Sequence, residues 1–164
     1  MAPEQLGVGA PVGNASDEAQ EARPVLVDKS AWEQRRHSDL ARRKIDQLAA
    51  AGRAATCLPV VLEQLYSARN AEDFASRRAA LELLQWLPVT PAVENEAIQL
   101  MARMARKGQH RMPLPDVMIA ATAAVHDAVV LHYDRDFERI AVLTGQPHEW
   151  IVPRGTGHGR DTEP

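Results

Sequence analysis

The chain has little of what secreted, membrane-spanning and all-β proteins depend on. Its single cysteine, Cys57, cannot form an internal disulfide, and it lies in the apolar run 54–58, where we expect a small buried side chain. No apolar run approaches the roughly 20 residues needed to cross a bilayer, and residues 1–5 lack the basic start of a secretory leader. These absences lead us to expect a cytoplasmic protein.

Aromatic residues are also scarce, at 4% of the 164 residues, whereas 45% of the residues are hydrophobic. A chain rich in Ala, Leu and Val but poor in aromatics favours helices packed on a buried sheet over a β-sandwich. The length suits one domain with tails. Residues 1–22 and 154–164 show no apolar period, so we predict flexible extensions around a folded domain at 23–153.

The net charge of −3 provides no general attraction for nucleic acid, so any such surface must be local. Two groups of cations are candidates for contact with phosphates, although a solvated helix face would carry similar charges. The better candidate is the first group, Arg35, Arg36, Arg42, Arg43 and Lys44, and the second group is Lys107, His110 and Arg111.

Short apolar runs alternate with helical periods along the chain. The runs predict strands at 24–27, 54–58, 86–89, 129–133 and 149–152. Between them we predict a helix capped by Ser30 and helices over about 38–51, 59–67, 71–85, 91–107, 117–126 and 134–143, with a break at 113–115. This alternation predicts an α/β fold with a central, mostly parallel sheet flanked by helices.

Four acids fall where such a sheet binds ligands, which is the edge at the carboxyl ends of its strands. Asp28 and Asp134 each end a predicted strand, Glu63 lies in the second turn of a helix, and Asp116 begins another helix. Taken singly, Asp28, Asp116 and Asp134 could instead be turn residues or helix caps. Glu63 is placed by helical spacing between Val60 and Tyr66, on the apolar side of its helix, where a carboxylate without a cation is costly.

Carboxylates brought together repel one another unless a divalent cation neutralises them. Ligation by oxygen alone indicates Mg²⁺ or Mn²⁺, since Zn²⁺ usually recruits Cys or His. Hard cations held by Asp and Glu cleave phosphodiesters by activating water and stabilising negative charge. The pattern therefore predicts metal-assisted hydrolysis of a nucleic acid, and no Gly-x-Ser-x-Gly motif or histidine pair at helical spacing indicates another chemistry.

Four motifs in this order resemble the PIN domain of VapC-type toxins, from Val25 to Phe137. They are Leu26 to Trp32, Leu62–Glu63, Pro115 to Ala121, and Asp134 to Phe137. The resemblance implies a PIN fold and an endoribonuclease with Mg²⁺ or Mn²⁺, the toxin of a type II toxin-antitoxin pair. It further implies an RNA substrate, a cognate antitoxin, a homodimer and a toxin-antitoxin hetero-oligomer.

Carried over position by position, the resemblance assigns metal binding and catalysis to Asp28, Glu63, Asp116 and Asp134, with Asp136 as an auxiliary acid. Ser30 matches a hydroxyl residue that can hold a carboxylate or a metal-bound water.

The sequence departs from many relatives at Lys29 and at His132–Tyr133, although neither departure removes an acid. Two other functions stay open. One is a PIN-like module that binds RNA or a protein without cleaving, which is disfavoured because all four acids are present. The other is an aspartyl nucleophile at Asp28, which lacks a second acid at Ser30.

Overall fold

The computed structural model describes residues 23–157, so the predicted extension 1–22 and most of the predicted tail 154–164 lie outside the described residues. Its centre is a five-stranded parallel sheet with the strand order β3-β2-β1-β4-β5. The strands are β1 (Val25–Val27), β2 (Ala54–Thr56), β3 (Gln85–Trp86), β4 (Val129–His132) and β5 (His148–Trp150). The predicted α/β fold is confirmed, and every strand pair within residues 23–157 is parallel.

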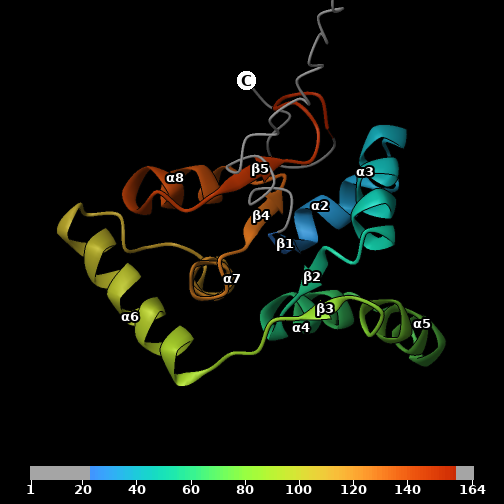
Figure 1. The fold of residues 1–164 in the computed structure, drawn as a ribbon, viewed down its shortest axis with the longest axis horizontal. Helices are drawn as coiled ribbons and strands as arrows, with labels where there is room; N and C mark the ends of the chain where they lie inside the picture. Colours follow the sequence, from blue (N-terminus) through green and yellow to red (C-terminus); the bar gives the residue numbers. More distant parts are fainter. Residues whose placement is uncertain (1–22, 158–164) are drawn as a thin grey trace, which may run out of the picture.

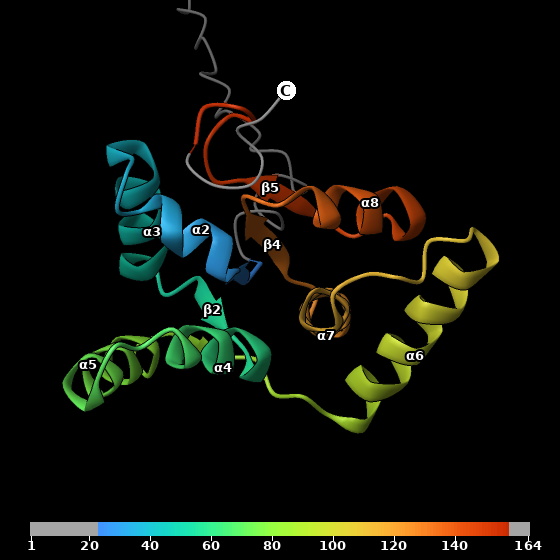
Figure 2. The same ribbon diagram turned by 180° about the vertical axis from the view of Figure 1, so that it is seen from behind.

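Helices cover both faces of the sheet (Figure 1). They are α2 (Lys29–Gln34), α3 (Asp39–Ala50), α4 (Leu58–Tyr66), α5 (Ala71–Leu81), α6 (Pro91–Arg106), α7 (Leu114–Val125) and α8 (Arg135–Thr144). Seen from front and back, α5 and α6 lie at opposite ends of the molecule (Figures 1 and 2). None of the helices in residues 23–157 is long and apolar enough to cross a membrane.

The central strand β1 explains why there are two hydrophobic cores. Successive side chains of a strand point to opposite faces, and all three residues of β1 are buried. Leu26 packs with side chains of α4, α6, α7 and α8, whereas Val25 and Val27 pack with those of α2 and α3. A run of three apolar residues is therefore the expected pattern for a strand buried on both faces.

Three local predictions are wrong. The cap of α2 is Asp28, not Ser30, because the Asp28 side chain accepts a hydrogen bond from the Ser30 N–H. The helix expected from 117 begins at Leu114, so that Pro115 lies in its first turn, where a proline loses no intrahelical hydrogen bond. The helix expected over 71–85 ends at Leu81, because Gln85 and Trp86 pair with β2 as strand β3.

The chain after β5 packs back against the end of β4. The Tyr133 hydroxyl accepts hydrogen bonds from the backbone N–H groups of Gly155 (3.1 Å) and Gly157 (2.8 Å). A Cβ atom at Gly157 would lie 2.6 Å from both the Tyr133 ring and Gln34 Oε1. Only glycine fits at this position without displacing Tyr133, which directly precedes Asp134.

Candidate active site

The carboxyl ends of β1 and β4 bring Asp28 and Asp134 to the same edge of the sheet. The two strands are paired neighbours, and the Asp28 N–H donates to the Leu131 carbonyl at 2.9 Å. Asp116 lies in the first turn of α7, and Asp136 lies in the first turn of α8. These four acids lie at the amino ends of three helices, α2, α7 and α8. The amino ends of the helices in a parallel α/β fold lie at the carboxyl edge of the sheet, so the acids share that edge.

Asp28 is buried, with 5% of its surface exposed, and is held by Ser30. Its Oδ2 atom accepts hydrogen bonds from the Ser30 N–H at 2.8 Å and from the Ser30 hydroxyl. The same hydroxyl accepts a hydrogen bond from the Tyr133 N–H at 2.8 Å. Ser30 thus ties Asp28 to the residue before Asp134. Burial raises the pKa of Asp28 in spite of the Ser30 hydrogen bonds, which lower it.

Asp134 caps α8 and is anchored from both sides. Its Oδ1 atom accepts from the Asp136 N–H at 2.9 Å, and its own N–H donates to His132 Nδ1 at 3.1 Å. His132 is fully buried, and its Nε2 atom lies 2.8 Å from His148 Nδ1. Because His132 Nδ1 accepts a hydrogen bond, the proton of the neutral ring belongs on Nε2, which donates to His148. Burial lowers the pKa of His132 to about 3, so this ring is neutral near pH 7.

Three aspartates come closest together. One carboxylate oxygen each from Asp116, Asp134 and Asp136 lies within 4.8 Å of the others. Burial raises the pKa of Asp116 to about 8, and the charges of Asp28, Asp134, Asp136 and Glu63 add to the effect. The four acids predicted from the sequence, together with Asp136, therefore share one electrostatic environment.

Asp28 and Glu63 stand outside the group of three. Among the described residues, only the set of Asp116, Asp134 and Asp136 meets the 4.8 Å spacing for three metal-ligating side chains. Asp136, which the resemblance makes an auxiliary acid, is thus in the tightest part of the cluster. The sequence signal for it was the repeat of aspartate two residues after Asp134, in the first turn of the same helix.

Glu63 is half-buried on α4, and the apolar arc around it is narrower than predicted. Val60 is fully buried, but Tyr66 is 93% exposed. Burial raises the pKa of Glu63, and the charge of Asp28 raises it further, whereas Lys29 lowers it. Glu63 is thus linked electrostatically to the acidic edge through Asp28.

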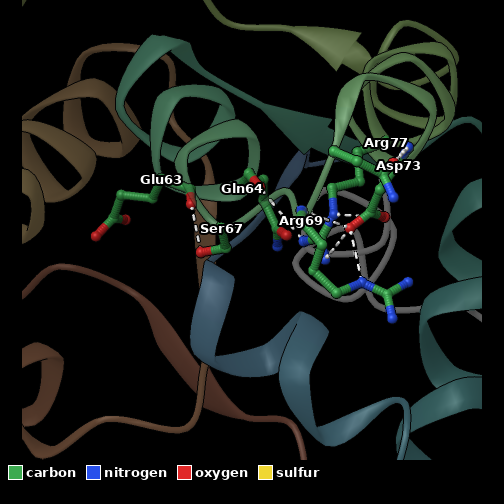
Figure 3. A network of polar contacts seen from close by, with 7 residues as sticks. Glu63, Gln64, Ser67, Arg69, Asp73 and Arg77 are labelled. Carbon is green, nitrogen blue, oxygen red and sulfur yellow. Dashed lines mark hydrogen bonds and ion pairs between the residues drawn. The ribbon is translucent and has the colours of Figure 1, made fainter.

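The side chain of Glu63 points away from Arg69 and Arg77 (Figure 3). Arg77 and Arg69 are both engaged by Asp73, with Arg77 Nε at 3.0 Å from Oδ1 and Arg69 Nε at 3.2 Å from Oδ2. These two hydrogen-bonded arginines hold the pKa of Asp73 well below its usual range. Arg69 and Arg77 therefore do not neutralise Glu63.

The donor set fits a hard divalent cation. Carboxylate oxygens are the ligands preferred by Mg²⁺ and Mn²⁺, and a cation would offset both the burial and the neighbouring charges that raise the pKa of Asp116. Burial raises the pKa of Cys57 to about 11, and the charges of Asp28 and Glu63 add to the effect. A thiol with this pKa stays protonated near neutral pH and is a poor metal ligand.

Comparisons with known proteins agree with this geometry. Residues 25–143 match the PIN domain family. The chain is 39% identical over 133 residues to ribonuclease VapC18 of Mycobacterium tuberculosis, covering 79% of this chain and 96% of that protein. It is 42% identical over 137 residues to ribonuclease VapC21 of the same species, covering 80% and 96%.

Solved structures with this fold include two VapBC assemblies. DNA-bound VapBC from Salmonella typhimurium matches with a TM-score of 0.64 at 21% identity, covering 79% of this chain and 99% of that chain. VapBC-5 of Mycobacterium tuberculosis, a toxin-antitoxin system, matches with a TM-score of 0.53 at 26% identity, covering 79% and 97%. The likeness extends over nearly all of each matched chain.

Proposed function

This chain belongs to the VapC family of PIN-domain ribonucleases, and we propose that it hydrolyses RNA with Mg²⁺ or Mn²⁺ held by Asp28, Glu63, Asp116 and Asp134. It is the toxin of a type II toxin-antitoxin pair. The observation that supports the site most strongly is the approach of Asp116, Asp134 and Asp136 to within 4.8 Å, which a cation would stabilise. Asp136 belongs to the proposed site for the same reason.

The chain's own residues position the acids for this chemistry. A bound divalent cation supplies an activated water and stabilises negative charge on the scissile phosphate. Ser30 fixes one Asp28 oxygen, and the α8 cap fixes one Asp134 oxygen, so neither carboxylate must reorient before it binds a ligand. Glu63, whose pKa is raised by burial and by Asp28, is suited to exchange a proton with water during hydrolysis.

We also infer that a cognate antitoxin inhibits this site in the cytoplasm, where RNA is available. A basic side chain inserted among the acids could replace the charge of the cation. The matched VapBC assemblies support the existence of such a partner. We further infer a homodimer and a toxin-antitoxin hetero-oligomer, for which exposed apolar side chains such as Leu83 (87%) and Val142 (87%) offer contact area.

The function is tested with purified full-length chain and labelled RNA. We expect cleavage in Mg²⁺ or Mn²⁺, no cleavage in EDTA, and losses of orders of magnitude for Asp28→Asn and Asp116→Asn. Glu94→Gln, an exposed acid in the first turn of α6, is the matched control and should cleave like the wild type. Full activity in EDTA, or near wild-type turnover of either aspartate variant, would show that the site is assigned wrongly.

A further inference from the structure

Exposed cations that no acid neutralises lie in the connection that leads to Asp116. Arg106, Lys107 and Arg111 are exposed, and none of their side chains forms an ion pair or hydrogen bond with another residue in the range 23–157. The sequence from Ala97 to Pro115 contains no acid. In a chain of net charge −3, this segment is therefore a local positive surface.

The first group of cations expected to contact phosphates is, by contrast, largely neutralised. Arg35 pairs with Asp46 at 2.7 Å, Arg42 pairs with Asp39, and Lys44 pairs with Glu149. An anion that bound there would have to compete with carboxylates already in contact. The sequence made the first group the better candidate, whereas the ion pairs of the structure favour the second.

The backbone presents the cations of the second surface on a defined turn, residues 105–111, which we call the basic turn. Gly108 has a φ of +67°, its N–H donates to the Ala105 carbonyl, and the Gln109 N–H donates to the Met104 carbonyl. Met104 and Met112 are buried on either side of the turn. Cations presented on an anchored turn lose less conformational entropy on binding than cations on a free loop.

A helix-terminal role explains only part of this charge. Arg106 ends α6, and Lys107 is its C-cap residue, where cations interact favourably with the helix dipole. Arg111 lies beyond the helix and gains nothing from that dipole. Asp116 follows it five positions later, so even a fully extended chain would place the two Cα atoms no more than about 18 Å apart.

We propose that the basic turn binds the phosphate backbone of the RNA substrate beside the acidic site, an inference that rests on the ribonuclease function proposed above. The clustered carboxylates repel a polyanion, so a substrate strand needs cations close to the site that will cleave it. Lysine and arginine pair with phosphate oxygens independently of base identity. The basic turn would hold the strand while the acids act on one of its phosphates.

The test compares two double variants that each remove two exposed cations. Lys107→Gln with Arg111→Gln changes the basic turn. Arg36→Gln with Arg43→Gln is the matched control, since these arginines are also exposed and their side chains form no ion pair or hydrogen bond with the described residues. Both are made in the Asp116→Asn background. Binding of a fluorescent RNA oligonucleotide that the wild-type chain cleaves is measured between about 50 and 200 mM salt.

We expect the basic-turn variant to bind at least about tenfold more weakly and to lose roughly 1.4 from the slope of log affinity against log salt, at about 0.7 for each contact with a single strand. The control should stay within about threefold of its parent. With Asp116 intact, the basic-turn variant should show a raised KM and a nearly unchanged kcat. Thermal unfolding of each protein checks that the fold is retained.

The outcomes separate this proposal from the proposed function. If the wild-type chain cleaves no RNA, the proposed function itself is wrong. If it cleaves RNA while the basic-turn variant binds and cleaves as tightly and as fast as its parent, only the role of the basic turn is wrong. Equal weakening of both double variants would also overturn it, because the effect would then reflect total charge and not this surface.

Discussion

Replacing Asp116 by Asn should make the metal-free protein more stable, and increasingly so as the pH rises. The Asp116 carboxyl is 9% exposed, and burial followed by the charges of four neighbouring acids raises its pKa from 3.8 to about 8. Between these pH values the folded chain holds a proton that the unfolded chain has lost. The free energy of unfolding therefore falls as the pH rises from about 4 to about 8.

The size of this loss follows from the pKa. At about 1.4 kcal/mol for each pH unit between 3.8 and about 8, the loss has an upper limit of about 6 kcal/mol. Water that enters the site reduces the cost of ionisation, so we expect the wild type to lose about 2 kcal/mol or more. Asp116→Asn carries no titrating group at this position, so its free energy of unfolding should fall by at most half as much over the same pH range.

Urea unfolding in EDTA at pH 5, 6.5 and 8 measures this difference for the wild type, Asp116→Asn and Glu94→Gln. Glu94 also lies in a first helical turn but is exposed, so its replacement should shift stability by less than about 1 kcal/mol at every pH. Adding Mn²⁺ at pH 8 should restore stability to the wild type more than to Asp116→Asn. A wild type equally stable at pH 5 and pH 8 in EDTA, or an unchanged pH dependence in Asp116→Asn, would refute the reasoning.

Three further predictions concern the acidic site and the residues that support it. Asp28→Asn should raise the metal-free stability at pH 7 by about 1 kcal/mol and shrink the stabilisation by Mn²⁺, as thermal scans with and without EDTA would show. His148→Ala removes the acceptor of the His132 hydrogen bond, which loosens the ring that holds Asp134, and should weaken Mn²⁺ binding about tenfold. His148→Asn keeps an acceptor and should restore much of the affinity. Equal Mn²⁺ affinities of the wild type and His148→Ala would show that this hydrogen bond does not anchor Asp134. Gly157→Ala should destabilise the fold by about 1 to 3 kcal/mol through its clash with Tyr133, and unaltered urea unfolding would contradict that packing.

The positions of Asp28 and Asp134 could be predicted because each follows a short apolar run, and both runs form buried parallel strands. Neighbouring parallel strands have their carboxyl ends at the same edge of the sheet, so the residues that follow the two strands are expected to lie close together. Predicting which side chain caps α2 was harder. Aspartate and serine cap helices almost equally well, so placing the cap on Ser30 instead of Asp28 misplaced the helix start by two residues.

Features that depend on contacts between elements could not be predicted. In the sequence, Asp136 has the position of an acid that merely stabilises the first turn of a helix. Its place in the site depends on the packing of α7 and α8, which brings its carboxylate close to that of Asp116. Helical spacing placed Tyr66 with Val60, but what packs against α4 decides exposure, and Tyr66 is left in solvent. The contact of His132 with His148 joins two strands that are neighbours only in the folded sheet.

Capping and participation in the acidic site, which are alternatives when the sequence is considered alone, occur together in Asp28 and Asp134. Each side chain accepts an N–H at the start of its helix, and each also raises the pKa of Asp116. Helix amino ends gather at the carboxyl edge of a parallel sheet, so the N–H groups that hold a carboxylate lie where the site is built. Asparagine keeps a capping oxygen but not the charge. The activity of an Asn variant therefore reports the charge of the site separately from the integrity of the helix.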